Sequence, residues 1–211
     1  MGCGKKQILG STSDATESVI DASGKNLFTL DKADTELGIK NLTITGARTA
    51  IDNQAGKAHL ENVVIKDTVG DTALKNGATL TLKDVSVDKG VENTGTITGE
   101  GILSLAGLSG TGTLTMNGAT LDVADKFKTT NKIVSNGMKI GDNVTSEIHF
   151  ADLEIKDNTT LDIKTLQATA NTVTVGENAT LGITLKNLDE YGTMKADEII
   201  AKEDSKVHLT L

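Results

Sequence analysis

Proline and tryptophan are absent from this chain, and other large aromatic side chains are scarce, with one Tyr and three Phe. Aromatic side chains supply much of the buried area in an ordinary globular core, so their scarcity argues against such a core. The absence of Pro fits an architecture in which every strand donates backbone hydrogen bonds to a neighbour. Both absences favour a stack of short strands filled by small aliphatic side chains.

Arginine and cysteine are also scarce, with one residue of each, Arg48 and Cys3. The formal net charge of −8 and the scattered lysines argue against nucleic-acid binding, which needs clustered cations. Cys3 has no partner for an intrachain disulfide. No apolar run approaches the roughly 18 residues of a membrane span, and residues 1–6 lack the apolar stretch of a secretory signal. We therefore expect no direct membrane insertion and no signal peptide in this chain.

A short apolar phrase recurs at steps of 21 and 22 residues, as Ile39-x-x-Leu42-x-Ile44, Leu60-x-x-Val63-x-Ile65 and Leu82-x-x-Val85-x-Val87. A recurrence of this length is typical of repeat proteins, whose units are too small to bury an apolar face alone and stack on their neighbours. Within each unit, apolar residues alternate with Thr, Lys, Asp and Ser, which is the pattern of a strand with one buried face. The sequence therefore predicts an all-β parallel solenoid.

The chain divides into a polar N-terminal tail or cap, residues 1–24, and a solenoid over residues 25–211, in which the strand pattern starts at Leu27. At roughly 21 residues per coil this length predicts about nine rungs, cut from a longer array. Residues 188–202 form the only segment with some helical character. The alternation assigns sixteen aliphatic residues to the core: Leu42, Ile44, Val63, Ile65, Leu80, Leu82, Val85, Val87, Leu103, Leu114, Leu161, Ile163, Val173, Val175, Leu181 and Ile183.

An asparagine follows the second apolar point of three successive coils, at Asn53, Asn76 and Asn93. At equivalent turns, each side-chain amide can bond to the one above and the one below. We therefore assign these three residues to a structural ladder rather than to a ligand site.

Four phrases share the pattern Asn-x-(x)-Thr-Leu-x-aliphatic: Asn76-Gly-Ala-Thr-Leu-Thr-Leu82, Asn117-Gly-Ala-Thr-Leu-Asp-Val123, Asn158-Thr-Thr-Leu-Asp-Ile163 and Asn178-Ala-Thr-Leu-Gly-Ile183. This repeat style resembles the passenger domains of bacterial autotransporters and related surface adhesins, over about residues 27–211. The resemblance implies a single-stranded, right-handed parallel β-helix of the pectate-lyase-like shape. It also implies a secreted or outer-membrane protein at the cell surface, with a structural or adhesive function.

The partners implied by this resemblance are host surface proteins or glycans, and no cofactor or metal is expected. The rod ends would expose strand edges that permit end-to-end association. The alternative is a polysaccharide lyase or hydrolase of the same β-helix class, which needs carboxylates for Ca²⁺ and a basic proton acceptor on one face. Neighbouring coils supply four candidate carboxylates, at Asp67, Asp71, Asp84 and Asp88. A solvated face of mixed charge explains the same residues, so we expect a non-catalytic protein.

A third class of function, ice binding, is raised by five Thr-x-Thr pairs, because ice-binding solenoids use outward rows of this kind. The pairs begin at Thr43, Thr79, Thr96, Thr113 and Thr172. The steps between successive pairs are unequal, and none of them matches the step of the recurrent apolar phrase. The sequence therefore predicts that the pairs lie on different faces, where Thr serves as an ordinary strand residue.

Overall fold

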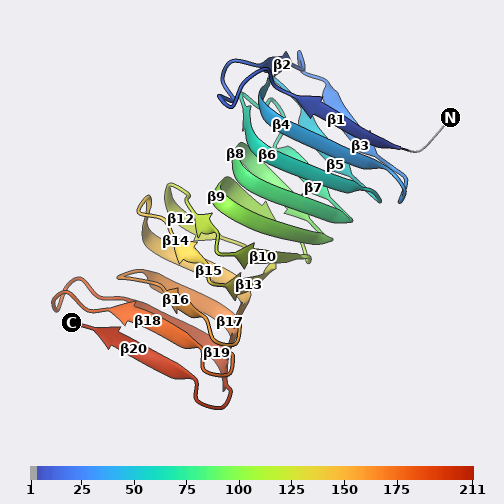
Figure 1. Cartoon of the computed structure of the whole chain (residues 1–211). Coiled ribbons are helices and arrows are strands. Elements are labelled where there is room, and N and C mark those ends of the chain that lie inside the picture. Colours follow the sequence, from blue (N-terminus) through green and yellow to red (C-terminus); the bar gives the residue numbers. More distant parts are fainter. Residues whose placement is uncertain (1–3) are drawn as a thin grey trace.

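The computed structural model describes residues 4–211, and all regular structure in this range is β-strand. The strands stack in parallel as a solenoid of about eight turns (Figure 1). The strands are β1 (Lys5–Leu9), β2 (Val19–Asp21), β3 (Asn26–Leu30), β4 (Glu36–Thr45), β5 (Thr49–Asn53), β6 (Lys57–Lys66), β7 (Thr72–Asn76), β8 (Thr79–Asn93), β9 (Thr96–Ser109), β10 (Thr113–Asn117), β11 (Thr120–Leu121), β12 (Asp125–Lys128), β13 (Lys132–Asn136), β14 (Lys139–Ile140), β15 (Val144–Ile155), β16 (Thr160–Asp162), β17 (Gln167–Val175), β18 (Thr180–Thr184), β19 (Thr193–Ala201) and β20 (Lys206–Thr210). Cys3 lies outside the described residues.

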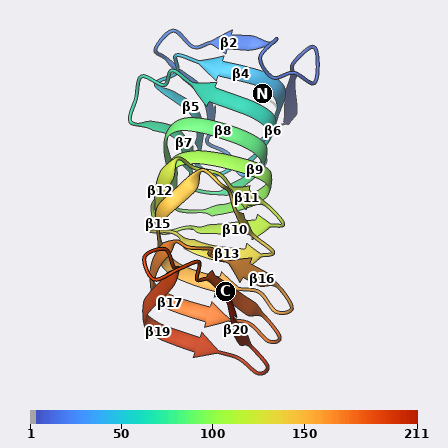
Figure 2. The same cartoon turned by 90° about the vertical axis from the view of Figure 1, so that its left-hand side faces the viewer.

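Each coil runs across three faces of the stack, which Figure 2 shows from the side. The first face contains β1, β10 and β13, together with the parts of longer strands that pair in line with them. The second face contains β2, β11, β14 and the separate sheet of β16, β18 and β20. The third face contains β3, β5, β7 and β12. The long strands β8 and β9 cross all three faces.

The core is a continuous column of aliphatic side chains inside the coils. Along the second face, for example, Ile44 pairs with Ile65, Ile65 with Val87, and Val87 with Leu105, and all four are at most 2% exposed. Each inward residue therefore packs on the inward residue of the neighbouring coil, at the strand spacing of about 4.8 Å. The sixteen core positions predicted from the sequence are all buried except Ile183, which is partly buried against the same core.

The corner between the first and second faces requires a left-handed backbone conformation. In successive coils it is occupied by Asn41, Asn62, Asp84 and Gly101, with φ between 51° and 63°. Asn, Asp and Gly tolerate this conformation better than other residues, because other side chains crowd the following carbonyl. The two positions written x-x in the recurrent phrase therefore form the bend of each coil. The alternation of inward and outward side chains shifts by one residue at this bend.

The structure corrects three expectations. The solenoid has about eight turns rather than about nine, and its coils are unequal in length: the coil from Gln167 to its register partner Thr193 is long, whereas the coil from Thr79 to Thr96 is short. Strands begin at β1 and β2, which pair with β4, and not first at Leu27. The segment with helical character, residues 188–202, contains strand β19 instead.

Candidate functional site

The four candidate carboxylates are spread over several corners of the solenoid, and three of them serve local structure. Asp84 lies at the corner between the first and second faces, where its Oδ1 accepts a hydrogen bond of 2.9 Å from the Ile102 amide. Asp88 Oδ2 accepts one of 3.0 Å from the Thr68 amide, at the far end of the second face. Since four residues of extended strand span about 13 Å, these two carboxylates cannot share one cation.

The other two candidates do not complete a site. Asp67 accepts a hydrogen bond of 2.9 Å from Thr45 Oγ1, and Asp71 lines a separate hollow beside Arg48. Across residues 4–211 no group of three or more His, Cys, Asp or Glu side chains is arranged to hold a metal ion. The structure therefore does not bring all four candidate carboxylates together at one point.

The asparagine ladder is continuous and buried. Asn53 Nδ2 donates to Asn76 Oδ1 and Asn76 Nδ2 donates to Asn93 Oδ1, both at 2.8 Å, and the three side chains are at most 2% exposed. Each Nδ2 also donates to a backbone carbonyl of the following turn, Thr79, Thr96 or Thr113 respectively. The ladder fixes the corner between the third and first faces in three coils.

The ladder has a fourth member, Asn131, which the sequence pattern did not indicate. Asn93 Nδ2 donates to Asn131 Oδ1 at 2.6 Å, although the two residues are 38 positions apart. Gly110 lies between them in the intervening coil with φ 105°, and a Cβ there would lie 2.2 Å from the Asn93 carbonyl oxygen. The absence of a side chain at Gly110 lets the ladder skip one coil, so no regular spacing identifies Asn131.

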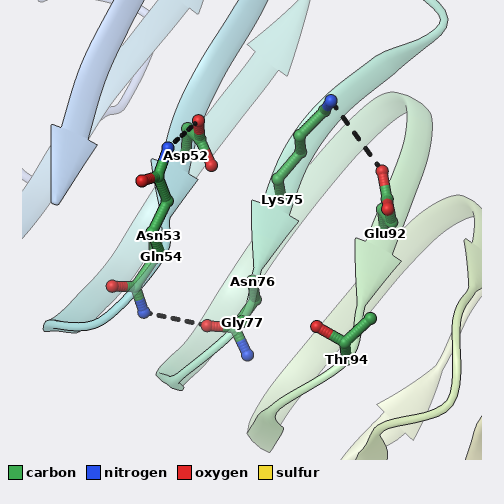
Figure 3. A pocket seen from close by; sticks show the side chains of 8 residues that line it. All are labelled: Asp52, Asn53, Gln54, Lys75, Asn76, Gly77, Glu92 and Thr94. Carbon is green, nitrogen blue, oxygen red and sulfur yellow. Dashed lines mark hydrogen bonds and ion pairs between the residues drawn. The ribbon is translucent and has the colours of Figure 1, made fainter. Parts of the chain in front are cut away.

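A shallow hollow of about 290 Å³ opens beside the ladder, across β5, β7 and β8 (Figure 3). Its rim is polar: Gln54 donates to Asp52 at 2.8 Å, and Lys75 lies 3.9 Å from Glu92. The amide of Asn53 points toward Asn76 and is used within the ladder. These groups can make polar contacts with a ligand, but the residues lining this hollow include no nucleophile paired with a base.

Rows of ion pairs cross the first face. Glu61 accepts from Lys40 at 3.0 Å and from Lys83 at 3.1 Å, and so joins three coils. Glu154 accepts from Lys132 of the preceding coil at 2.6 Å and from Lys156 of its own coil at 2.9 Å, and so joins two coils. The hydrogen bond from Lys132, followed by that from Lys156, lowers the pKa of the Glu154 carboxyl to about 2.

Replacing Glu154 by Gln should lower the stability of the protein in a pH-dependent way. Because the pKa of Glu154 is lower in the folded chain than in the unfolded chain, its contribution is present above about pH 4.5 and is lost as the pH falls toward 2. We expect a loss of about 1–2 kcal/mol at pH 7 and a smaller loss at pH 3, measured by urea unfolding. Glu177→Gln, in an exposed turn, is the control. Equal losses at both pH values would contradict this explanation.

The threonine pairs give a further correction. Thr79 pairs with Thr96 and Thr96 with Thr113, and the second members Thr81, Thr98 and Thr115 pair in the same way. Three of the five Thr-x-Thr pairs are therefore stacked in register on the first face. The prediction of different faces was wrong for them, because the coil becomes shorter where β8 and β9 cross the corners without loops.

The remaining two Thr-x-Thr pairs are not stacked on these three. Thr43 pairs with Val64 on the second face. Thr172 lies on the first face, but Lys132 and Asp152 separate it from Thr113 in the register. We call the six stacked side chains the threonine array: Thr79, Thr81, Thr96, Thr98, Thr113 and Thr115.

No helix within residues 4–211 has the length and apolar character needed to span a bilayer. Comparisons with protein-family models, curated proteins and solved structures found no match to the chain. The structure thus shows the architecture of the chain, which is a parallel β-solenoid built from repeats.

Proposed function

We propose that the chain is a non-catalytic rod that forms a structural or adhesive segment of a bacterial cell-surface protein of the autotransporter type. The observation that carries this proposal is the uninterrupted core, which links residues from the first coil to the last through paired strands. A stack of this kind holds its outer side chains in fixed rows, and solenoids use such extended surfaces to bind other molecules. The surface location is supported by the resemblance of the Asn-Thr-Leu phrases.

The first face is the surface that we propose for presentation to a host protein or glycan. Its outward positions form straight rows across coils, with the threonine array at the centre and the ion pairs of Glu61 and Glu154 on either side of it. Mixed charges and hydroxyls of this kind suit polar partners through hydrogen bonds. The four candidate carboxylates, in contrast, do not converge on one point, because Asp84 lies at a different corner from Asp67 and Asp88, and this supports presentation over catalysis.

Binding of the immobilised chain to panels of glycans and host surface proteins tests the adhesive role. We expect saturable binding that is reduced at least tenfold by Thr98→Lys, which places a charge in the centre of the threonine array. The matched control is Ser104→Lys, a partly exposed residue of the same strand β9 on the second face. Equal effects of the two substitutions would reject the first face, and the absence of any binding would reject adhesion.

Incubation of the chain with acidic polysaccharides, with and without Ca²⁺, distinguishes a non-catalytic rod from a polysaccharide lyase. The proposal predicts no unsaturated products. Their appearance, and their loss in Asp84→Ala, would replace it with a catalytic function.

Ice binding is a second candidate, which the register of the threonine array favours. The array places hydroxyl and methyl groups on a grid of about 4.8 Å between coils and about 6.7 Å along each strand. This candidate predicts thermal hysteresis and shaped ice crystals for the unmodified chain and for Ser104→Lys, with loss of both effects in Thr98→Lys. Ordinary ice growth in the presence of the unmodified chain would eliminate it.

A further inference from the structure

The dipeptide Asn-Gly occurs three times in the chain, as Asn76-Gly77, Asn117-Gly118 and Asn136-Gly137. An Asn before a Gly is chemically reactive, because the backbone nitrogen of the Gly can attack the side-chain carbonyl carbon of the Asn, and Gly has no Cβ to crowd this approach. The attack needs a backbone N–H that is free to lose its proton and an Asn side chain that is free to turn toward it. The fold therefore decides which of the three dipeptides can react.

The first dipeptide is protected at both reacting groups. The Asn76 side chain is 2% exposed and is held in the asparagine ladder between Asn53 and Asn93. The Gly77 N–H donates a hydrogen bond of 2.7 Å to the backbone carbonyl of Asn53. Neither the side chain nor the attacking nitrogen is free to move, so this site should be inert in the folded chain.

The second dipeptide is open to solvent but is protected at its nitrogen. Asn117 is partly exposed and Gly118 is exposed. The Gly118 N–H donates a hydrogen bond of 2.9 Å to the backbone carbonyl of Asn136, in the following coil. This bond must open before the nitrogen can react, so exposure alone does not make Asn117 reactive.

The third dipeptide lacks both kinds of protection. Asn136 is exposed, and its side chain makes one hydrogen bond, from Nδ2 to Asn117 Oδ1 at 3.0 Å. Within the part of the chain that the structure describes, the Gly137 N–H donates to no acceptor. Gly137 has φ 75°, and a Cβ built there would meet nothing nearer than Gly118 at 3.9 Å, so the space around the reacting nitrogen is open.

We propose that Asn136 is a site of spontaneous self-modification, at which the chain converts this residue to aspartate and isoaspartate. The Gly137 nitrogen gives its proton to water and attacks Cγ of Asn136, so that the N–Cγ bond forms, the Cγ–Nδ2 bond breaks and Nδ2 leaves as ammonia. The resulting five-membered succinimide then takes up a water molecule. Opening of the new N–Cγ bond gives aspartate, whereas opening at the main-chain carbonyl gives isoaspartate. Because both reacting groups belong to one chain, no other reactant is needed.

The reaction would change the charge of the first face. Ser135 pairs with Ile155, so the next position of the register places Asn136 beside Lys156. The new carboxylate would therefore lie beside the lysine that now pairs with Glu154 at 2.9 Å. The isoaspartate product also adds a methylene group to the backbone, at the turn between the first and second faces. These consequences hold whether or not the face binds a partner.

Peptide mapping by mass spectrometry of the folded full chain, after incubation at mildly alkaline pH, tests this proposal. Cleavage after lysine places the three Asn-Gly dipeptides in separate peptides, so one sample gives all three rates. We expect conversion at Asn136 to be at least tenfold faster than at Asn76 or Asn117, because opening a hydrogen bond costs about this factor in rate. The product peptide should separate into an aspartate and an isoaspartate form.

The same chain unfolded in guanidinium chloride is the control for local sequence. Unfolding removes the hydrogen bonds of Gly77 and Gly118, so all three sites should then react at comparable rates. Asn136→Gln lengthens the side chain so that the five-membered ring cannot form, and this variant should give no product in that peptide. Equal rates at Asn136 and Asn117 in the folded chain would overturn the proposal, as would an unmodified Asn136 in the folded chain once the unfolded chain has reacted.

Discussion

Ile65→Asp should unfold the coils around β6 in the N-terminal half of the solenoid. Ile65 is 1% exposed and is stacked between Ile44 and Val87, so an aspartate there loses the packing of the aliphatic side chain and buries a charge without a partner. We expect a loss of about 5 kcal/mol in the free energy of unfolding, measured with urea. Because each coil of a solenoid contacts only its neighbours, hydrogen exchange should accelerate first in β4, β6 and β8.

The matched control for this substitution is Val64→Asp. Val64 is the preceding residue of the same strand and points to the opposite side, where it is partly exposed. We expect a loss of about 1 kcal/mol or less, because the charge remains in contact with water. The Ile65→Asp variant should also recover part of its stability as the pH falls, since burial raises the pKa of the introduced carboxyl and favours its neutral form. Equal losses for the two variants at pH 7 would show that the register is wrong.

Asn76→Leu should have the second largest effect, because it removes the central member of the asparagine ladder while keeping a similar volume. The substitution leaves Asn93 Oδ1 without its donor and removes the acceptor of Asn53 Nδ2, both of which are buried. An unsatisfied buried polar group costs about 1–3 kcal/mol, so we expect a loss of about 2–4 kcal/mol by urea unfolding.

Asn53→Leu provides the comparison within the same ladder. Asn53 Oδ1 is buried without a hydrogen-bond partner, and its neighbour in the preceding coil is the apolar Leu30. Replacing Asn53 therefore also removes an unsatisfied acceptor, and the loss should be smaller than for Asn76→Leu by about 1 kcal/mol or more. The double variant should lose less than the sum of the two single variants, because the replaced groups were each other's partners. Additive losses would contradict a continuous ladder.

The recurrent phrase was sufficient to predict which residues face inward. Side chains alternate strictly along a strand, and stacked coils align the same phrase, so Ile44, Ile65 and Val87 were assigned correctly from their spacing alone. The bend of each coil was present in the same phrase as Asn41, Asn62 and Asp84. Its meaning was missed, although Asn or Asp before an apolar residue at every recurrence is a signal for the left-handed conformation.

The threonine array shows why coil length could not be extrapolated along the chain. A constant step, taken from the recurrent phrase, assigns Thr79, Thr96 and Thr113 to different faces, whereas the strands place them in one row. The step depends on how many residues form loops at the corners, and loops that face solvent leave little trace in the apolar pattern.

The sequence by itself determined the fold class and the buried face of nearly every strand, because the alternation of apolar and polar residues is a local property that survives any change in coil length. Only the tertiary structure decided which outer side chains are neighbours. Pairing between coils brings together residues that are far apart in the chain, as in Thr79 with Thr96 or Asn93 with Asn131, and the length of each intervening corner sets their separation in sequence. The ion pairs and the threonine array follow from that pairing, since each depends on the register of whole coils rather than on any one segment.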